Sequence, residues 1–374
     1  QTTPAESWDY TATQHILLAD LELRGRLRKV LMQAPKNGFF YVLDRETGEL
    51  LSAEPSVSTS WASHVDLETG RPVETGRANW HDEPRFVLPS VMGGHNWHPM
   101  AFHPKTGLVY IPSYEYPYRF HPAKREPGAK RPAFLSGTLN TAEDLAALGA
   151  ELDGYERSLR FCEGTHLTAW DPVAGRRVWR VSHRSEINGG ALATGDDLVF
   201  QGSGDARFVA YRASNGERLW SSQVGVAVMA GPVSYELDDE QYVAVLAGAG
   251  GAAGLNLTSF DYQNKGYVIA YKLGGQAQIP RAELRPVREP DPPPLRADAA
   301  TVKRGADLYQ TYCFRCHGMG TRSGGLLPDL RQAKRSVHEQ WEAIVRGGVR
   351  ASRGMPSFAD VLSSDDASAN HAYV

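Results

Sequence analysis

"AWDPVAGRRVW" (169–179) and "AYRASNGERLW" (210–220) repeat one pattern and begin 41 residues apart. Each copy has a strand that ends in an apolar pair, a short turn containing Gly, and a second strand that ends in Trp179 or Trp220. The Gly allows a tight turn, and a Trp at a fixed place can wedge between neighbouring sheets. A repeat of strands near this period predicts the blades of a β-propeller.

Further copies of the pattern lie on both sides of these two. They are "VLDRETGELLS" (42–52), "AFHPKTGLVYI" (101–111) and a weaker copy that begins at "AYKLGG" (270–275). Short apolar or alternating runs bounded by turn signals fill the intervals between them. The alternative is a set of chance hairpins, but four to five copies favour blades. We therefore predict that residues 1–273 form a mainly β region.

The pattern changes after residue 273. Residues 274–297 are rich in Pro, with three in succession at 292–294, and they predict an extended, semi-rigid linker. Residues 298–374 then carry apolar residues at helical spacing, in "AATVKRGADLYQTYC" and "VHEQWEAIVRGGV". About 80 residues suffice for one small domain only if something besides a core helps to stabilise it.

The helical region contains a Cys-Phe-Arg-Cys-His pentad. Cys-x-x-Cys-His is the attachment signature of c-type haem, in which Cys313 and Cys316 bind the porphyrin covalently and His317 ligates the iron. A chance or zinc-type cysteine pair is the alternative reading. The pentad predicts that this end of the chain transfers electrons.

Two downstream residues complete the predicted haem site. Pro328, in "LLPDL", can offer its carbonyl to the far nitrogen of His317, which would fix the ring and raise its basicity. Met355, in "SRGMPSF", is a candidate sixth ligand, with a buried apolar Met as the alternative. Together these residues are identified as the pattern of a class I cytochrome c, an all-α fold.

Composition excludes other classes. The formal net charge of −3 gives no basic balance for nucleic acid, and no apolar run approaches the roughly 18 residues of a membrane-spanning helix. Of three cysteines, the pentad leaves Cys162 alone, so it is read as a small buried hydrophobe and no disulfide framework is predicted.

The two ends of the sequence lack start and stop signals. The chain opens on "QTTPAESWDY" without an initiator Met and ends on "ANHAYV" without a helix cap. We expect a fragment of a longer protein, with the last helix of the cytochrome domain clipped.

Several stretches resemble the pyrroloquinoline-quinone (PQQ) dependent alcohol dehydrogenases. They are "SWDYTATQHILLADL", "LMQAPKNGFFYVLDRETGELLSAE", "GGHNWHPMAFHPKTGLVYIP" and "YVAVLAGAGGAAGL". With the haem region, nearly the whole chain is similar to the quinohaemoprotein alcohol dehydrogenases. The resemblance implies a partial eight-bladed β-propeller, about half of the blades, followed by a small cytochrome c domain.

The resemblance also implies PQQ, calcium and haem c as cofactors. Asp9, in the Trp-Asp-Tyr motif, matches the family's base, which accepts the alcohol proton and commonly ligates calcium. Lanthanide-dependent relatives carry a second Asp two places on, where this chain has Thr11. The alternative reading of Asp9 is a turn or capping residue.

Three further residues match positions that meet PQQ in the family. Lys36, in "APKNG", would place a cation against the quinone oxygens, whereas the alternative is a solvated turn Lys. Asn96 and Trp97, in "HNWHP", match pocket positions, although a buried structural Trp is equally natural in a propeller. Ala249 stands in the Gly-rich loop where relatives often carry Trp.

The function implied is oxidation of a small primary or secondary alcohol by PQQ. Electrons would pass to haem c and on to a soluble cytochrome, a copper protein or a quinone, and cofactor maturation implies the periplasm. Because the family's other PQQ and calcium groups precede the Trp-Asp-Tyr motif, the fragment alone is expected to be inactive. The alternatives are a non-catalytic propeller that carries haem or docks partners, and a different substrate for the same chemistry. Asp9 and Lys36 favour the enzyme over the carrier.

Overall fold

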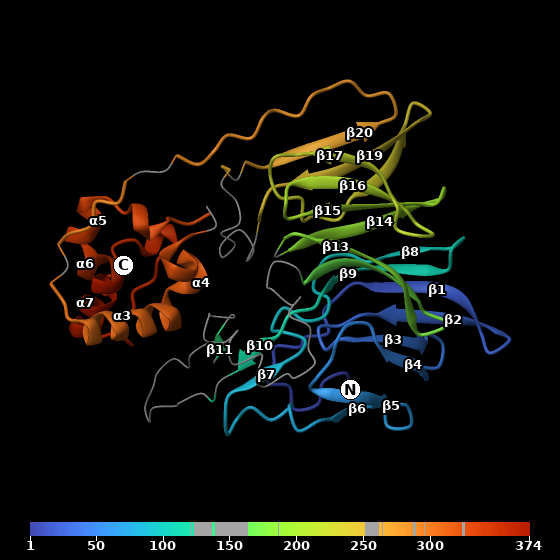
Figure 1. Ribbon diagram of the computed structural model, residues 1–374, viewed down its shortest axis with the longest axis horizontal. Coiled ribbons are helices and arrows are strands. Elements are labelled where there is room, and N and C mark those ends of the chain that lie inside the picture. Colours follow the sequence, from blue (N-terminus) through green and yellow to red (C-terminus); the bar gives the residue numbers. More distant parts are fainter. Residues whose placement is uncertain are drawn as a thin grey trace. The chain divides into compact units, whose positions relative to one another are not determined.

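The computed structural model describes residues 1–120, 122, 137–138, 164–185, 187–250, 262–263, 265–286, 289–294, 296–323 and 326–374. The chain divides into two compact units, which are described separately (Figure 1). The β unit comprises Gln1–Pro122, Gly137–Ala249 and Lys265–Ala282. The helical unit comprises Ala123–Ser136, Gly250–Asn264 and Glu283–Val374. The predicted limits at residues 273 and 297 remain predictions.

Antiparallel sheets make up the β unit. The described residues form four main sheets, whose strands follow in spatial order. The first sheet is β1 (Ile16–Leu23), β2 (Arg26–Gln33), β3 (Phe39–Asp44) and β4 (Leu50–Pro55), and the second is β13 (Arg176–His183), β12 (Thr165–Asp171), β9 (Leu108–Tyr114) and β8 (Ala101–His103). The third sheet is β14 (Asn188–Thr194), β15 (Leu198–Ser203), β16 (Arg207–Arg212) and β17 (Arg218–Gln223), and the fourth is β18 (Val233–Leu237), β19 (Glu240–Ala247) and β20 (Tyr267–Lys272). The smaller ones are β11 (Gly137–Thr138), β10 (Tyr118–Phe120), β7 (Arg85–Val87); and the hairpin of β5 (Ala62–Asp66) and β6 (Arg71–Glu74).

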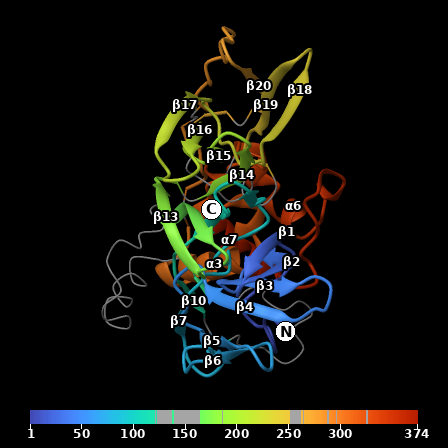
Figure 2. The same ribbon diagram turned by 90° about the vertical axis from the view of Figure 1, so that its right-hand side faces the viewer.

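The main sheets follow one another through the β unit in chain order, as two views at right angles show (Figures 1 and 2). Between the first and second sheets, Phe40 packs on Trp170 with ring centroids 5.8 Å apart. Buried aliphatic side chains continue each contact from one sheet to the next. Burial on both faces explains why the inner strands, such as β9, are apolar at nearly every position.

The repeated Trp residues join neighbouring sheets, as the sequence predicted. Trp179 of β13 donates its indole N–H to the carbonyl of Ala213 (3.0 Å), which lies in the turn of the following sheet. Trp220 of β17 packs edge-on against Tyr271 of β20, with ring centroids 5.1 Å apart. Each ring therefore contacts the neighbouring sheet, although Trp220 is 41% exposed.

The repeat does not occupy one fixed place in a sheet. The copies at 42–52, 169–179 and 210–220 form the third and fourth strands of their sheets, but the copy at 101–111 forms β8 and β9, the first two. Its Gly107 has a positive φ of 68°, like the turn glycines of the other copies. The sequence pattern thus encodes a hairpin with a left-handed Gly, not a position in a blade.

The helical unit is built from helices around a small hydrophobic core. They are α3 (Ala299–Tyr312), α4 (Phe314–His317), η1 (Met319–Thr321), η2 (Leu330–Gln332), α5 (Arg335–Glu339), α6 (Trp341–Val345), η3 (Ala351–Arg353) and α7 (Ser364–Tyr373). Helices α3 and α7 cross at Gly305, where a Cβ atom would collide with the carbonyl of Ala369. No helix in the described residues is long and apolar enough to cross a membrane.

Candidate active site and haem centre

The Trp-Asp-Tyr motif precedes β1 and holds Asp9 between two buried rings. The carboxylate of Glu6 accepts the backbone N–H groups of Trp8 (2.6 Å) and Tyr10 (2.7 Å), and the Tyr10 hydroxyl donates to the carbonyl of Pro89. Asp9 itself has a φ of 66°, in the left-handed region that Asp tolerates better than most residues. The two anchored rings therefore hold Asp9 in place, and its side chain is 45% exposed to solvent.

Lys36 lies in the loop between β2 and β3, and its Nζ is 2.9 Å from Oδ2 of Asp9. Its side chain is 8% exposed, so it is a buried ammonium rather than a solvated turn Lys. The next residue fixes the loop, because Asn37 donates to the hydroxyl of Tyr41 (2.8 Å) and accepts from the indole of Trp61 (2.8 Å). The structure thus brings together two predicted site residues as a cation and a carboxylate.

The other two predicted PQQ contacts lie in the loop 92–98. The side-chain amide of Asn96 donates to the carbonyl of Met92 (2.8 Å), and its oxygen accepts the backbone N–H of Trp97 (2.8 Å). Trp97 is 53% exposed and stacks on His98 with ring centroids 4.0 Å apart. It is therefore not a buried structural Trp, while Asn96 is committed to shaping its own loop. Their contact with PQQ stays a prediction.

Asp9 is the predicted calcium ligand at this site. In the described part of the chain, no group of three or more His, Cys, Asp or Glu side chains is placed to hold a metal ion. One Asp9 oxygen is already bonded to Lys36. Since calcium takes six to eight oxygen ligands, the calcium site at Asp9 stays a prediction.

The haem pentad spans the end of α3 and the short helix α4. Cys313 is buried, which raises the pKa of its thiol to about 12, and Cys316 is exposed. Nδ1 of His317 lies 3.0 Å from the carbonyl oxygen of Pro328, which confirms the predicted hydrogen bond. A neutral imidazole that donates from Nδ1 keeps the Nε2 lone pair for a metal. These residues therefore fit a covalent c-type haem.

Met355 follows a left-handed Gly354 (φ 89°) at the end of η3. It is partly buried and packs in the core cluster that contains Tyr312 and Trp341. Tyr312 directly precedes Cys313, so this cluster adjoins the pentad. Ligation of the haem iron by Met355 stays a prediction.

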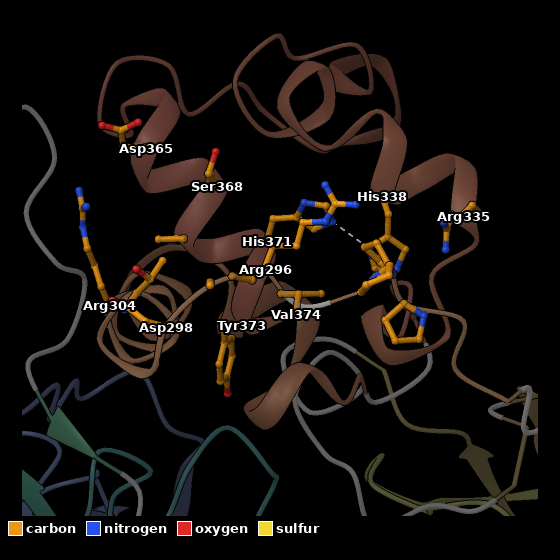
Figure 3. A pocket seen from close by; sticks show the side chains of 17 residues that line it. Arg296, Asp298, Arg304, Arg335, His338, Asp365, Ser368, His371, Tyr373 and Val374 are labelled. Atoms are coloured by element: carbon orange, nitrogen blue, oxygen red, sulfur yellow. Dashed lines mark hydrogen bonds between the residues drawn. The ribbon is translucent and has the colours of Figure 1, made fainter.

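A cavity of about 1070 Å³ lies in the helical unit (Figure 3). On its lining, Nδ1 of His338 is 3.0 Å from Nε2 of His371, so one imidazole donates and the other accepts. Trp341 stacks on both rings, at interplanar angles of 11° and 12°. The charged residues that line the cavity are Arg296, Asp298, Arg304, Arg335 and Asp365. The pair joins α5 to α7.

Acid should weaken this pair. Burial lowers the pKa of both histidines, helped by the charge of Arg335 at His338 and by His338 at His371. The folded chain thus binds fewer protons than the unfolded chain, and stability falls as pH drops below the ordinary value of 6.5. Unfolding followed at the haem Soret band at pH 7.5 and 5.0 checks this, and H371N should show a smaller loss. An equal loss in both proteins would contradict it.

Two sequence-family models match the chain. The model of "Glucose/ethanol/alcohol dehydrogenase, beta-propeller domain" matches residues 1–62 and 164–243. The model of "Cytochrome C oxidase, cbb3-type, subunit III" matches residues 300–374. The matches follow the division into strands and helices.

Relatives match over the whole chain. It is 44% identical to "Quinohemoprotein alcohol dehydrogenase ADH-IIG" of Pseudomonas putida and 39% identical to "Quinohemoprotein alcohol dehydrogenase" of Comamonas testosteroni, over 100% of this chain and 52% of each relative. The solved structures of these two proteins superimpose with TM-scores of 0.85 and 0.81, over 55% and 54% of their lengths. Over its whole length, the chain is therefore similar to the quinohaemoprotein alcohol dehydrogenases. It spans about half the length of the relatives it matches.

These matches confirm the predicted fold, part of a PQQ-type propeller followed by a cytochrome c domain. Some sequence-based interpretations fall on residues 151–163 and 251–254, outside the described residues, namely Cys162 and the end of the Gly-rich loop. Ala249, at the start of that loop, is buried.

Sequence reasoning missed Glu6, which supports the family's Trp-Asp-Tyr motif. The available signal was an acidic residue two positions before a tight turn, where a carboxylate commonly accepts backbone N–H groups.

Proposed function

We propose that this chain forms part of an enzyme that oxidises alcohols with PQQ and passes the electrons through haem c. The observation that carries the proposal is the Asp9–Lys36 pair, in which a buried ammonium lies 2.9 Å from a half-open carboxylate. A propeller that only docks partners needs no such pair. When bound, PQQ would supply a two-electron acceptor and haem c a one-electron exit.

Asp9 is the proton acceptor for the alcohol hydroxyl. Lys36 donates a hydrogen bond to Oδ2 of Asp9 and so orients the carboxylate. The same ammonium stabilises negative charge that develops beside it during oxidation. Asn37 and the anchored rings of the Trp-Asp-Tyr motif keep the two groups in place. Trp97 provides an exposed ring for the flat cofactor.

In the helical unit, Cys313 and Cys316 would hold haem c through thioether bonds, and Nε2 of His317 would bind its iron. The carbonyl of Pro328 orients the His317 ring, and Met355 would supply a further iron ligand. The names of the relatives support an alcohol as the substrate. A small primary or secondary alcohol, calcium at Asp9, an external electron acceptor and the periplasm are part of this proposal and rest on the sequence resemblance.

The experiment compares two proteins made with a haem c maturation system. One is the 374-residue chain, and the other is this chain fused behind the part of the Pseudomonas putida enzyme ADH-IIG that it does not match. The chain alone should carry covalent haem but bind little PQQ and oxidise no alcohol. The fusion, given PQQ and calcium, should show reduction of its haem on addition of alcohol. A fusion that binds PQQ without alcohol-driven haem reduction would instead support a haem carrier.

A further inference from the structure

The candidate site is built on two loops, and His95 connects them. One loop, between β2 and β3, carries Lys36, and the other, residues 92–98, carries Trp97. His95 is 1% exposed. Its Nδ1 lies 2.7 Å from the carbonyl oxygen of Ala34, and its Nε2 lies 2.7 Å from that of His98. Each carbonyl is within two residues of a predicted PQQ contact.

The backbone of the second loop lies directly against Lys36. The Gly94 N–H donates to the Lys36 carbonyl (2.9 Å). At Gly93, where φ is +80°, a Cβ atom would lie 2.5 Å from Cβ of Lys36, so the two segments touch without space for a side chain. Any shift of the 92–98 loop therefore changes the position of the Lys36 side chain.

The ring of His95 is the side-chain connection between these segments. A neutral imidazole donates to one of the two carbonyls, and an imidazolium donates to both. A phenyl ring would fill the same space but could donate to neither carbonyl. Packing alone thus cannot replace the histidine.

We propose that His95 is a positioning residue that fixes the Lys36 loop against the Trp97 loop and so keeps the ammonium of Lys36 at Asp9. The importance of this position for PQQ rests on the proposed function, but the positioning itself is measurable on the chain without any cofactor. No sequence motif points to this role of His95, because its two partners are backbone carbonyls, at residues 34 and 98.

The test is competitive acylation of the 374-residue chain with limiting acetic anhydride, read by mass spectrometry. Lys29, whose side chain is 52% exposed, serves as the internal reference for the buried Lys36. In the unchanged chain, Lys36 should react at least about tenfold more slowly than Lys29, since reaction needs local opening. In H95F, the rate of Lys36 acylation relative to Lys29 should rise about fivefold or more. In H95Q, this ratio should lie between those of H95F and the unchanged chain, because the amide can donate to a carbonyl but lacks the shape of the ring.

The matched control is H183F. His183 is also buried in the β unit, but it bonds to Gln201 (2.9 Å) and touches neither loop through that bond. H183F should leave the Lys36 ratio within about twofold of the unchanged chain. If H95F changes stability as H183F does but leaves the ratio unchanged, His95 is merely structural and the proposal is wrong. If H95F does not fold, H95Q and hydrogen exchange at the Gly94 amide decide the question.

A second measurement separates this proposal from the proposed function. In the fusion protein, K36M should weaken PQQ binding if Lys36 faces the quinone. If K36M leaves PQQ binding unchanged while H95F still frees Lys36 for acylation, the positioning holds and the cofactor assignment fails. If K36M weakens PQQ binding and H95F leaves the acylation ratio unchanged, the cofactor assignment holds and the positioning fails.

Discussion

Replacement of Asp9 by Asn is expected to lower alcohol-driven haem reduction in the fusion protein by about 100- to 10,000-fold, the range for loss of a general base. An amide keeps the shape of the carboxylate and can still accept the Lys36 hydrogen bond, but it cannot take up the alcohol proton at neutral pH. Stopped-flow absorbance of the haem after mixing with alcohol measures the rate.

The control for D9N is direct reduction of the haem by dithionite, which should be unchanged. Binding of PQQ should be measured in parallel, because Asp9 is also the predicted calcium ligand. A D9N rate above about one tenth of the unchanged protein, with PQQ bound, would show that another group accepts the proton.

Glu115→Ala is expected to lower the free energy of unfolding by about 3–5 kcal/mol, as for other broken buried ion pairs. Glu115 follows β9, and its side chain is 10% exposed. One of its oxygens accepts the backbone N–H (2.9 Å) and hydroxyl (3.2 Å) of Ser58, which follows β4. The other accepts from Arg180 and lies 3.4 Å from Nε2 of His166. Urea unfolding followed by tryptophan fluorescence measures the loss.

Glu115→Gln is the matched control, because it keeps an acceptor for Ser58 and removes the charge, so a smaller loss of about 1–3 kcal/mol is expected. Burial would raise the pKa of Glu115, but hydrogen bonds from His166 and Ser58 and the charge of Arg180 lower it to about 2. Its contribution is therefore present above the ordinary pKa of 4.5 and is lost as pH falls toward 2. A loss below about 1 kcal/mol for E115A would mean that Ser58 and Arg180 find other partners.

Local features of the sequence predicted much of the fold. Positive-φ glycines such as Gly216 stand in the expected hairpin turns, and Trp179 lies between two sheets as its place in the repeat indicated. The hydrogen bond from His317 to Pro328 was predicted because its partners are 11 residues apart in one recognisable motif. Such features depend on periodicity, turn chemistry and short spacing, which the sequence displays directly.

The remaining contacts depend on which distant segments of the chain meet in the fold. Ser58 and Glu115 are 57 residues apart, and His338 and His371 are 33 residues apart, without any pattern that links them. The motif match predicted Asp9 and Lys36 as site residues, but their ion pair follows from the left-handed turn at Asp9 and the buried loop at Lys36. Sequence patterns indicate which residues are buried, whereas only the packed structure determines which residues pair with one another across sheets.

The indole bond from Trp179 to Ala213 also has a consequence for how the protein is made. The donor and the acceptor are 34 residues apart, and the hydroxyls of Ser222 and Tyr271, which join the next two sheets, are 49 residues apart. During synthesis, the outermost strand of a sheet therefore waits for the following sheet to leave the ribosome before its last contacts can form. We therefore expect the sheets to assemble one after another, each packing on the sheet made before it. A delay in one sheet would leave exposed only the sheet that precedes it.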